Sequence, residues 1–183
     1  AEHSKMGGYC YLNNAAIAAE YCIKHGVRKV TIFDPDLHHG NGIQQYAWSR
    51  PDVQYISIHG DPSYCYPFYT GYADEEGEGL GVGTVINYPL RKGTGERTYH
   101  RVVRQAVSKI QEFGPDVLIV TAGFDTHKDD PLGTFRLSTG YYRTLAHELD
   151  KLDLPTLVVQ EGGYNVRSLG FNVVSFLSGF SMK

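Results

Sequence analysis

The sequence predicts an α/β fold in which a parallel β-sheet carries the core. Two observations lead to this prediction: short apolar segments alternate with longer amphipathic ones, and the short segments are apolar at nearly every position. Near-continuous apolar strands are typical of buried parallel sheets. Alternation of strands and helices further predicts right-handed crossovers between parallel neighbours. A length of 183 residues with 42% hydrophobic residues suits a single domain with its own core.

The expected elements follow one another along the chain with recognisable ends. Strands are expected at 29–34, 54–59, 116–121 and 155–160. Helices are expected at 14–25, 41–48, 95–113 and 139–152, with a last one after Val166. Gly26 and Gly114-Pro115 follow the first and third helices, and these residue types commonly end helices. Segment 60–92 breaks the alternation, and we expect a functional loop there because connections of this length are seldom passive.

Composition argues against several classes of protein. A net charge of −3 argues against nucleic acid as the main partner and fits a small cationic substrate. No apolar run approaches the roughly 18 residues of a membrane span, and the first residues do not form a signal peptide. The three cysteines, Cys10, Cys22 and Cys65, form no CxxC pair, which favours reduced thiols in a cytoplasmic protein.

Polar residues follow each expected strand at its carboxyl end, which is where ligands bind in open α/β sheets. Asp36 and His38 follow the first strand, and side chains two apart in an extended chain point the same way. Asp125 follows the third strand and could close the same site. Two carboxylates and one imidazole suit Zn²⁺ or Fe²⁺. The alternative, that these are solvated loop residues, is weakened because His59 ends the second expected strand and Tyr164 follows the fourth.

Four motifs together resemble one family. They are GGYCYLNN at 7–14, DPDLHHGNG at 34–42, AGFD at 122–125 and EGGY at 161–164. In this order they resemble the deacetylase branch of the arginase/deacetylase superfamily. The resemblance implies a three-layer fold, with helices on both faces of the parallel sheet. It also implies that residues 1–183 form the C-terminal part of one catalytic domain whose N-terminal part is absent.

The resemblance assigns roles to single residues. It makes Asp36, His38 and Asp125 the zinc ligands, and Tyr164 the residue that hydrogen-bonds the substrate carbonyl. Asp34 matches the carboxylate that orients one catalytic histidine. A structural K⁺ or Na⁺ is also implied. Its oxygen ligands would come from Asp34, Asp36, His38, Ser57 and Ile58.

The spacing of the motifs predicts one catalytic ion rather than two. Arginase-like relatives hold two Mn²⁺ ions with additional aspartates two positions after the histidine and after the second aspartate. Gly40 and His127 stand at those positions here, and Gly40 offers no carboxylate. An arginase-like ureohydrolase is therefore disfavoured, and one zinc ion, or one Fe²⁺, is expected.

A substrate tunnel is implied next to the metal ligands. Tyr9 and Tyr66 match its aromatic walls, and Gly8 and Gly163 flank it. The alternative for each tyrosine is ordinary packing. In the family a His-His pair acts as base and acid, and we expect it just upstream of Ala1, since His3 lacks a partner. Residues 1–183 alone are then expected to bind metal poorly and to turn over slowly.

The substrate is the least determined feature. The aromatic loop at 59–76 resembles bacterial acetylpolyamine amidohydrolases, and exposed acidic residues could attract a polyamine. The acidic residues are Asp74, Glu75, Glu76 and Glu78. We expect hydrolysis of an acetylpolyamine, with protein acetyl-lysine as the alternative substrate. A non-catalytic protein that binds acetylated ligands is a third reading, and assembly into a homo-oligomer is compatible with all of them.

Overall fold

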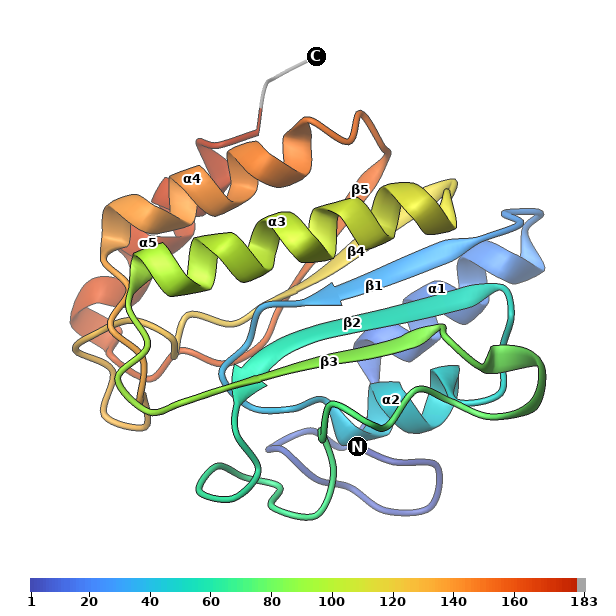
Figure 1. Ribbon diagram of the computed structural model, residues 1–183. Coiled ribbons are helices and arrows are strands. Elements are labelled where there is room, and N and C mark those ends of the chain that lie inside the picture. Colours follow the sequence, from blue (N-terminus) through green and yellow to red (C-terminus); the bar gives the residue numbers. More distant parts are fainter. Residues whose placement is uncertain (181–183) are drawn as a thin grey trace.

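The computed structural model describes residues 1–180. Five parallel strands form one sheet in the order β3-β2-β1-β4-β5 (Figure 1). The strands are β1 (Val30–Asp34), β2 (Val53–Gly60), β3 (Val85–Leu90), β4 (Val117–Ala122) and β5 (Thr156–Gln160). Every residue of β1 and β2 is buried. The parallel α/β fold predicted from the apolar segments is therefore confirmed.

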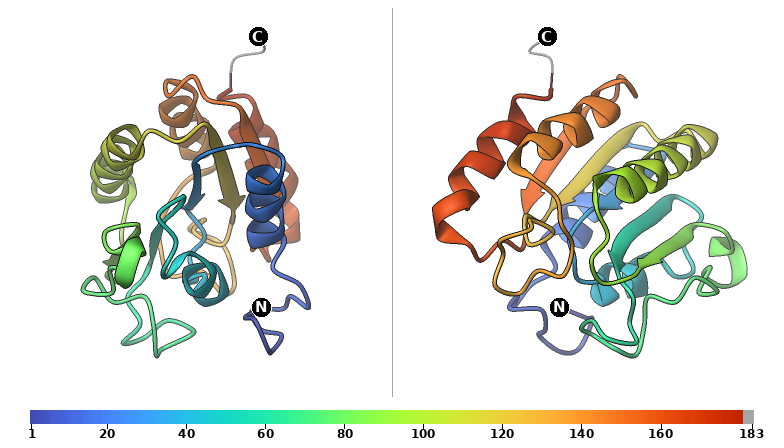
Figure 2. Two further views of the ribbon diagram at one scale, coloured as in Figure 1. Left: turned by 90° about the vertical axis from the view of Figure 1, so that its right-hand side faces the viewer. Right: turned by 60° about the vertical axis from the view of Figure 1, so that its left-hand side comes forward.

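Helices cover both faces of the sheet, so the fold has three layers (Figure 2). The helices are α1 (Asn14–Lys24), α2 (Asn41–Ala47), α3 (Glu96–Phe113), α4 (Thr139–Asp150) and α5 (Val166–Leu177), with a short 3₁₀ helix at Gly79–Gly81. α1 and α2 pack on one face, and α3, α4 and α5 pack on the other. Within residues 1–180, no helix has the length and apolar character needed to span a membrane.

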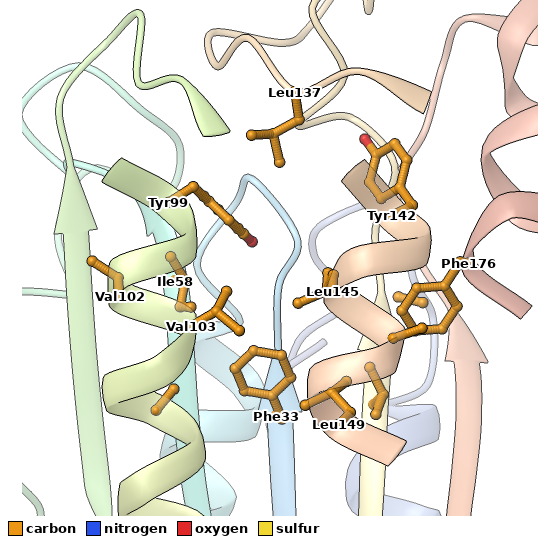
Figure 3. Close-up of a cluster of buried hydrophobic side chains, with 14 of the residues drawn as sticks. Phe33, Ile58, Tyr99, Val102, Val103, Leu137, Tyr142, Leu145, Leu149 and Phe176 are labelled. Atoms are coloured by element: carbon orange, nitrogen blue, oxygen red, sulfur yellow. The ribbon is translucent and has the colours of Figure 1, made fainter. Parts of the chain in front are cut away.

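The larger core cluster lies between the sheet and helices α3 to α5. Side chains from α3 and α4 converge on Phe33 of β1, as Figure 3 shows for Val103, Leu145 and Leu149. Phe33 has no exposed surface. Burying a side chain of this size contributes about 1.5–3 kcal/mol. This packing fixes β1, and with it the segment that follows β1.

Segment 60–92 is not the continuous loop that we expected, because its last part is strand β3. β3 pairs in parallel with β2 at the edge of the sheet. Its residues alternate between buried and half-exposed at the start, and it contains Pro89. Proline is tolerated in edge strands, where one row of backbone groups faces away from the sheet. Alternation and a proline hide a parallel strand from a search for continuous apolar segments.

The strand order places a topological switch point between β1 and β4. From β1 the chain moves outward through β2 to β3, and it then returns through α3 to pair β4 with the other side of β1. Loops that follow β1 and β4 therefore turn in opposite directions and leave a crevice between them. Asp36 and His38 follow β1, and Asp125 follows β4.

Candidate metal centre

Three predicted ligands meet in this crevice. Asp36, His38 and Asp125 offer ligand atoms that all lie within 4.8 Å of one another, and we call these residues the ligand cluster. The His38 Nδ1 atom lies 2.8 Å from Asp125 Oδ2 and 3.4 Å from Asp36 Oδ1. Asp125 is fully buried, Asp36 is buried and His38 is half-buried. His38 is the most exposed member of the cluster, and it lines the cavity together with Asp36.

The segment after β1 places its two ligands through local hydrogen bonds. β1 ends at Asp34, and residues 36–38 form a bend, so the alternation of an extended strand does not reach them. The His38 backbone N–H donates to Asp36 Oδ1 at 2.8 Å, and the Leu37 N–H donates to Asp125 Oδ1 at 2.9 Å. The convergence that we expected is present, but the bend and these hydrogen bonds produce it.

Two glycines allow the backbone to approach the carboxylates. The Gly162 N–H donates to Asp36 Oδ2 at 2.9 Å. A Cβ atom at Gly162 would lie 2.7 Å from Asp36 Oδ2 and closer still to Asp125 Oδ2. A Cβ atom at Gly123 would overlap the Asp36 carboxylate. The glycines of the AGFD and EGGY motifs therefore make room for the ligand cluster.

The two buried carboxylates of the cluster favour a positive charge beside them. Burial and the neighbouring charge of Asp36 raise the pKa of Asp125 to about 7. Burial alone would lower the pKa of His38, but hydrogen bonds to Asp125 and Asp36 outweigh it and raise that pKa to about 10. Burial would raise the pKa of Asp36, yet the contact with His38 keeps it low. Two buried carboxylates thus share one cationic partner.

The positions that could hold a second ion do not extend the cluster. A Cβ atom at Gly40 would lie 2.7 Å from Asp34 Oδ2 and from the Tyr55 hydroxyl, so this position has no room for a longer side chain. The His127 ring faces Thr139, with 3.3 Å between Nε2 and Oγ1, and stacks on Tyr142. Within residues 1–180, the ligand cluster is the one group of this kind.

A cavity of about 650 Å³ opens beside the cluster. Asp36 and His38 line it, together with Gly8, Tyr9 and Tyr66. The Tyr9 ring centroid lies 6.0 Å from that of Tyr164, and the Tyr66 ring centroid lies 6.5 Å from that of His38, both with an edge-to-face geometry. Both tyrosines therefore line the cavity beside the ligand cluster, and their role as tunnel walls stays a prediction.

One expected tunnel residue lies elsewhere. Gly163 is not among the residues that line the cavity, whereas Gly162 is. Gly163 adopts φ 130°, and a Cβ atom there would meet Leu169 and Phe124. The chain turns inward to the protein at Gly163 and returns to the cavity at Tyr164, which lines it.

Asp34 lies deeper in the cavity wall. Its Oδ2 atom accepts a hydrogen bond from the Tyr55 hydroxyl at 2.8 Å, and burial raises its pKa well above the usual range. Ser57 stands opposite Asp34 in the pairing of β1 with β2, and its hydroxyl lies 2.8 Å from His59 Nδ1. Ser57 and Ile58 are fully buried and do not line the cavity.

Glu161 and Cys10 belong to the site although neither was predicted there, and Glu75 has a different role from the one predicted. Glu161 lines the cavity, and burial together with the charge of Asp36 raises its pKa to about 7. The Cys10 thiol lies 3.9 Å from the Glu161 carboxylate. Glu75, which we expected to attract the substrate, turns inward: its Oε2 atom accepts hydrogen bonds from Gln44, Thr70 and the Gly71 backbone. Only the EGGY motif could have drawn attention to Glu161.

Ala1 lines the same cavity, and the Asn13 side-chain amide donates a hydrogen bond to its carbonyl oxygen at 3.1 Å. His3 does not line the cavity, and its backbone N–H donates to Gln45. His3 therefore offers no substitute for the histidine pair that the family resemblance implies.

Comparisons with known proteins agree with this geometry. Residues 1–180 match the family described as histone deacetylase domain. The chain is 47% identical over 175 residues to acetylpolyamine amidohydrolase 2 of Pseudomonas aeruginosa, an alignment covering 96% of this chain and 51% of the relative. It is 41% identical over 174 residues to the acetylpolyamine amidohydrolase of Mycoplana ramosa, covering 95% of this chain and 51% of the relative.

Solved structures show the same relationship. The acetylpolyamine aminohydrolase from Burkholderia pseudomallei matches with a TM-score of 0.96 and 43% identity, over 98% of this chain and 52% of that one. An HDAC homolog from Aquifex aeolicus matches with a TM-score of 0.92 and 29% identity, over 100% of this chain and 50% of that one. The chain spans about half the length of the relatives that it matches. The resemblance seen in the four motifs is confirmed, and the chain belongs to the histone deacetylase family with its arginase/deacetylase fold.

Proposed function

We propose that this chain supplies the metal-binding half of an amidohydrolase that removes the acetyl group from an acetylated amine. The observation that carries the proposal is the ligand cluster at the foot of a cavity that also presents the Tyr164 side chain between aromatic walls. An acetylpolyamine is the favoured substrate. Four relatives that are 41–47% identical to the chain are acetylpolyamine amidohydrolases.

The residue types of the ligand cluster suit one zinc ion, although His38 Nδ1 and Asp125 Oδ2, 2.8 Å apart in a direct hydrogen bond, would have to separate to bind it. Ligand atoms around a tetrahedral Zn²⁺ lie about 3.4 Å apart for ligand distances near 2.1 Å, and the His38 Nδ1 to Asp36 Oδ1 separation is 3.4 Å. Two buried carboxylates and one imidazole also suit Fe²⁺. We favour zinc and one ion per chain. When bound, such an ion polarises the substrate carbonyl and lowers the pKa of a water molecule.

The chain's own residues would bind and orient the substrate. Tyr9 and Tyr66 would hold the methylene chain between their rings and exclude water from it. The Tyr164 hydroxyl would donate a hydrogen bond to the carbonyl oxygen as negative charge develops there. Burial and the charges of Asp36 and Asp125 raise the pKa of Tyr164, so the phenol keeps its proton at neutral pH.

Proton transfer needs a further group. The Asp34 carboxylate lines the cavity and would orient a catalytic histidine, as the family resemblance implies. We propose that the histidine pair is joined to the amino side of Ala1, since Ala1 itself forms part of the cavity wall. We also propose a structural K⁺ or Na⁺ beside Asp34 and Ser57, whose positions on neighbouring strands support it. Backbone carbonyls of Asp36, His38 and Ile58 would complete that site.

Two observations bear on the substrate. Asp74, Glu76 and Glu78 are exposed on the loop that also carries Tyr66, and their charges favour a polycationic amine. The alternative substrate is protein acetyl-lysine, which the histone deacetylase 6 of Caenorhabditis elegans supports through 36% identity over 176 residues. The intact ligand cluster disfavours a non-catalytic binding protein. The absence of a carboxylate at Gly40 and at His127 disfavours an arginase-like ureohydrolase.

Rates on three acetylated substrates test the proposal. The zinc-loaded protein with its full natural chain is compared on acetylputrescine, acetylspermidine and an acetyl-lysine peptide, with Tyr164→Phe as the control variant. We expect the highest kcat/KM on an acetylpolyamine and a loss of at least a hundredfold in Tyr164→Phe. A clear preference for the peptide would replace the substrate, and no hydrolysis of any of the three would refute the function.

Location and assembly are secondary proposals. The three cysteines are unpaired, which supports a reducing, cytoplasmic environment. Exposed apolar residues on α5, among them Val166, Phe171 and Val174, support contact with another protein surface, and a second copy would give a homo-oligomer. Light scattering of the purified protein measures the mass and tests this assembly.

A further inference from the structure

A buried carboxylate holds the backbone of Tyr164. The Oδ2 atom of Asp130 accepts hydrogen bonds from the Tyr164 N–H at 2.7 Å and from the Asn165 N–H at 3.0 Å. Its Oδ1 atom accepts a third from the Leu132 N–H at 3.0 Å. Asp130 is 7% exposed. Both oxygens of one carboxylate are therefore committed, and two of the three donors belong to the segment that presents the tyrosine.

Two anchors hold the Tyr164 segment. Gly162 donates its N–H to Asp36 Oδ2 and accepts at its carbonyl oxygen from the Phe124 N–H, whereas Asp130 accepts from the Tyr164 N–H itself. Residues 161–165 lie between β5 and α5 and form neither helix nor strand. Gly162 and Gly163 precede the tyrosine, and glycine allows the backbone many conformations. The Tyr164 ring lines the cavity and meets Tyr9 edge-to-face, and the Tyr9 side chain is 85% exposed. The place of the phenol therefore depends on where its backbone is anchored.

The loop that carries Asp130 also carries a member of the ligand cluster. Asp125 lies near the start of this loop, three residues after the end of β4, and the Asp130 N–H donates to the His127 carbonyl oxygen at 3.0 Å. The Gly133 N–H donates to the Asp130 carbonyl oxygen at 3.0 Å, which makes the turn tight. The Asn165 side-chain amide adds a hydrogen bond to the Asp129 carbonyl at 2.8 Å. One short loop thus reaches from the ligand cluster to the backbone of Tyr164.

We propose that Asp130 is a positioning residue that sets the distance between the Tyr164 hydroxyl and the ligand cluster. The inference rests on the proposed function, in which Tyr164 donates a hydrogen bond to the reacting carbonyl. Asp130 neither lines the cavity nor belongs to the ligand cluster, so it would act through Tyr164. Loss of the carboxylate releases two backbone N–H groups and lets the tyrosine move. A misplacement of about 1 Å can cost a hundredfold in rate.

A double-mutant cycle tests this inference in the zinc-loaded protein with its full natural chain. Asp130→Ala and Tyr164→Phe are made singly and together, and kcat and KM on acetylputrescine are measured per bound zinc. We expect Asp130→Ala to lower kcat by about 10- to 100-fold with little change in KM. In the Tyr164→Phe background, the same change should lower kcat by less than about twofold, because the hydroxyl that it positions is gone.

Two further variants complete the design. Asp129→Ala is the matched control, since its side chain is exposed and its carbonyl keeps the bond to Asn165; we expect wild-type kcat. Asp130→Asn keeps one carbonyl oxygen for the Tyr164 and Asn165 N–H groups but places an amide against the Leu132 N–H. We expect an intermediate kcat, and Asp130→Asn carries the cycle if Asp130→Ala does not fold.

The outcomes separate this inference from the proposed function. An equal loss of kcat with and without the Tyr164 hydroxyl shows that Asp130 supports the fold in general, and this overturns the inference alone. Wild-type kcat in Asp130→Ala overturns it as well. Wild-type kcat in Tyr164→Phe overturns both the role proposed for the tyrosine and the inference. If Asp130→Ala lowers kcat only when Tyr164 is present, and Tyr164→Phe also lowers kcat, the result supports both the role proposed for Tyr164 and the inference about Asp130.

Discussion

Replacing Gly162 by alanine should weaken zinc binding without unfolding the protein. Gly162 has no left-handed backbone conformation, so alanine is conformationally allowed, and its effect comes from the space that its Cβ takes. That Cβ would lie 2.7 Å from Asp36 Oδ2, and contacts under 3.0 Å are essentially never seen. The Asp36 carboxylate must therefore move by at least about 0.3 Å, and Asp125 by more. Zinc sites tolerate about 0.2 Å in ligand distance.

Displacements of this size should lower the affinity for zinc by about 10- to 100-fold, or about 1.4–2.7 kcal/mol. Competition with a chromophoric chelator measures the affinity, and circular dichroism checks the fold. Gly170→Ala is the matched control, because Gly170 lies within α5 and its Cβ would meet no atom within 4 Å. Native affinity in a folded Gly162→Ala protein would refute the argument that this glycine exists to make room for the carboxylates.

Three other predictions concern stability. Burial lowers the pKa of His39 to about 4 and of His59 to about 3, below their unfolded value near 6.5, so both are neutral in the folded protein at pH 7. The free energy of unfolding should fall as the pH drops from 6.5 toward 4, by up to about 3 kcal/mol per histidine; urea titrations measure it, and His59→Gln should flatten the dependence. Glu75→Ala should cost about 1–3 kcal/mol by leaving three donors unpaired, whereas the exposed Glu76→Ala should cost under about 0.5 kcal/mol in the same assay. Zinc at a hundredfold excess over its Kd should raise Tm by about 5–10 °C. A Tm that neither zinc nor a chelator changes would contradict zinc binding by the ligand cluster.

Much of the fold could be predicted because four of the five strands are apolar at nearly every position. β1, β2, β4 and β5 lie within a residue or two of their expected ends, since their apolar segments stand between polar residues and turn residues. β3 was not predicted because its residues are not continuously buried and it contains Pro89, both of which an edge strand tolerates. The ligand cluster could be predicted because parallel strands bring their carboxyl ends to one edge.

What the sequence could not predict depends on contacts between distant segments. Asp130 stands in a turn of ordinary composition, and its partners lie 34 and 35 residues away. Glu75 belongs to a run of acidic residues, and only the folded loop shows that it faces inward while Glu76 faces solvent. Gly162 and Gly163 are adjacent glycines that the sequence cannot distinguish. In the folded chain Gly162 lies against the carboxylates of the ligand cluster, whereas Gly163 lies against Leu169 and Phe124.

The pairing of β1 with β4 has a consequence for how the protein folds. Val30 pairs with Val117, so this central contact joins residues that are far apart along the chain, with β2, β3 and α3 between them. Forming such a contact requires closure of a long loop before any pairing energy is gained, and parallel sheets dominated by distant contacts fold slowly. His38 and Asp125, which are 87 residues apart, can meet only after this step. Partly folded chains should therefore hold a β1–β2–β3 unit with two of the three ligands, Asp36 and His38. Metal binding by all three ligands would then appear only after β4 has paired with β1.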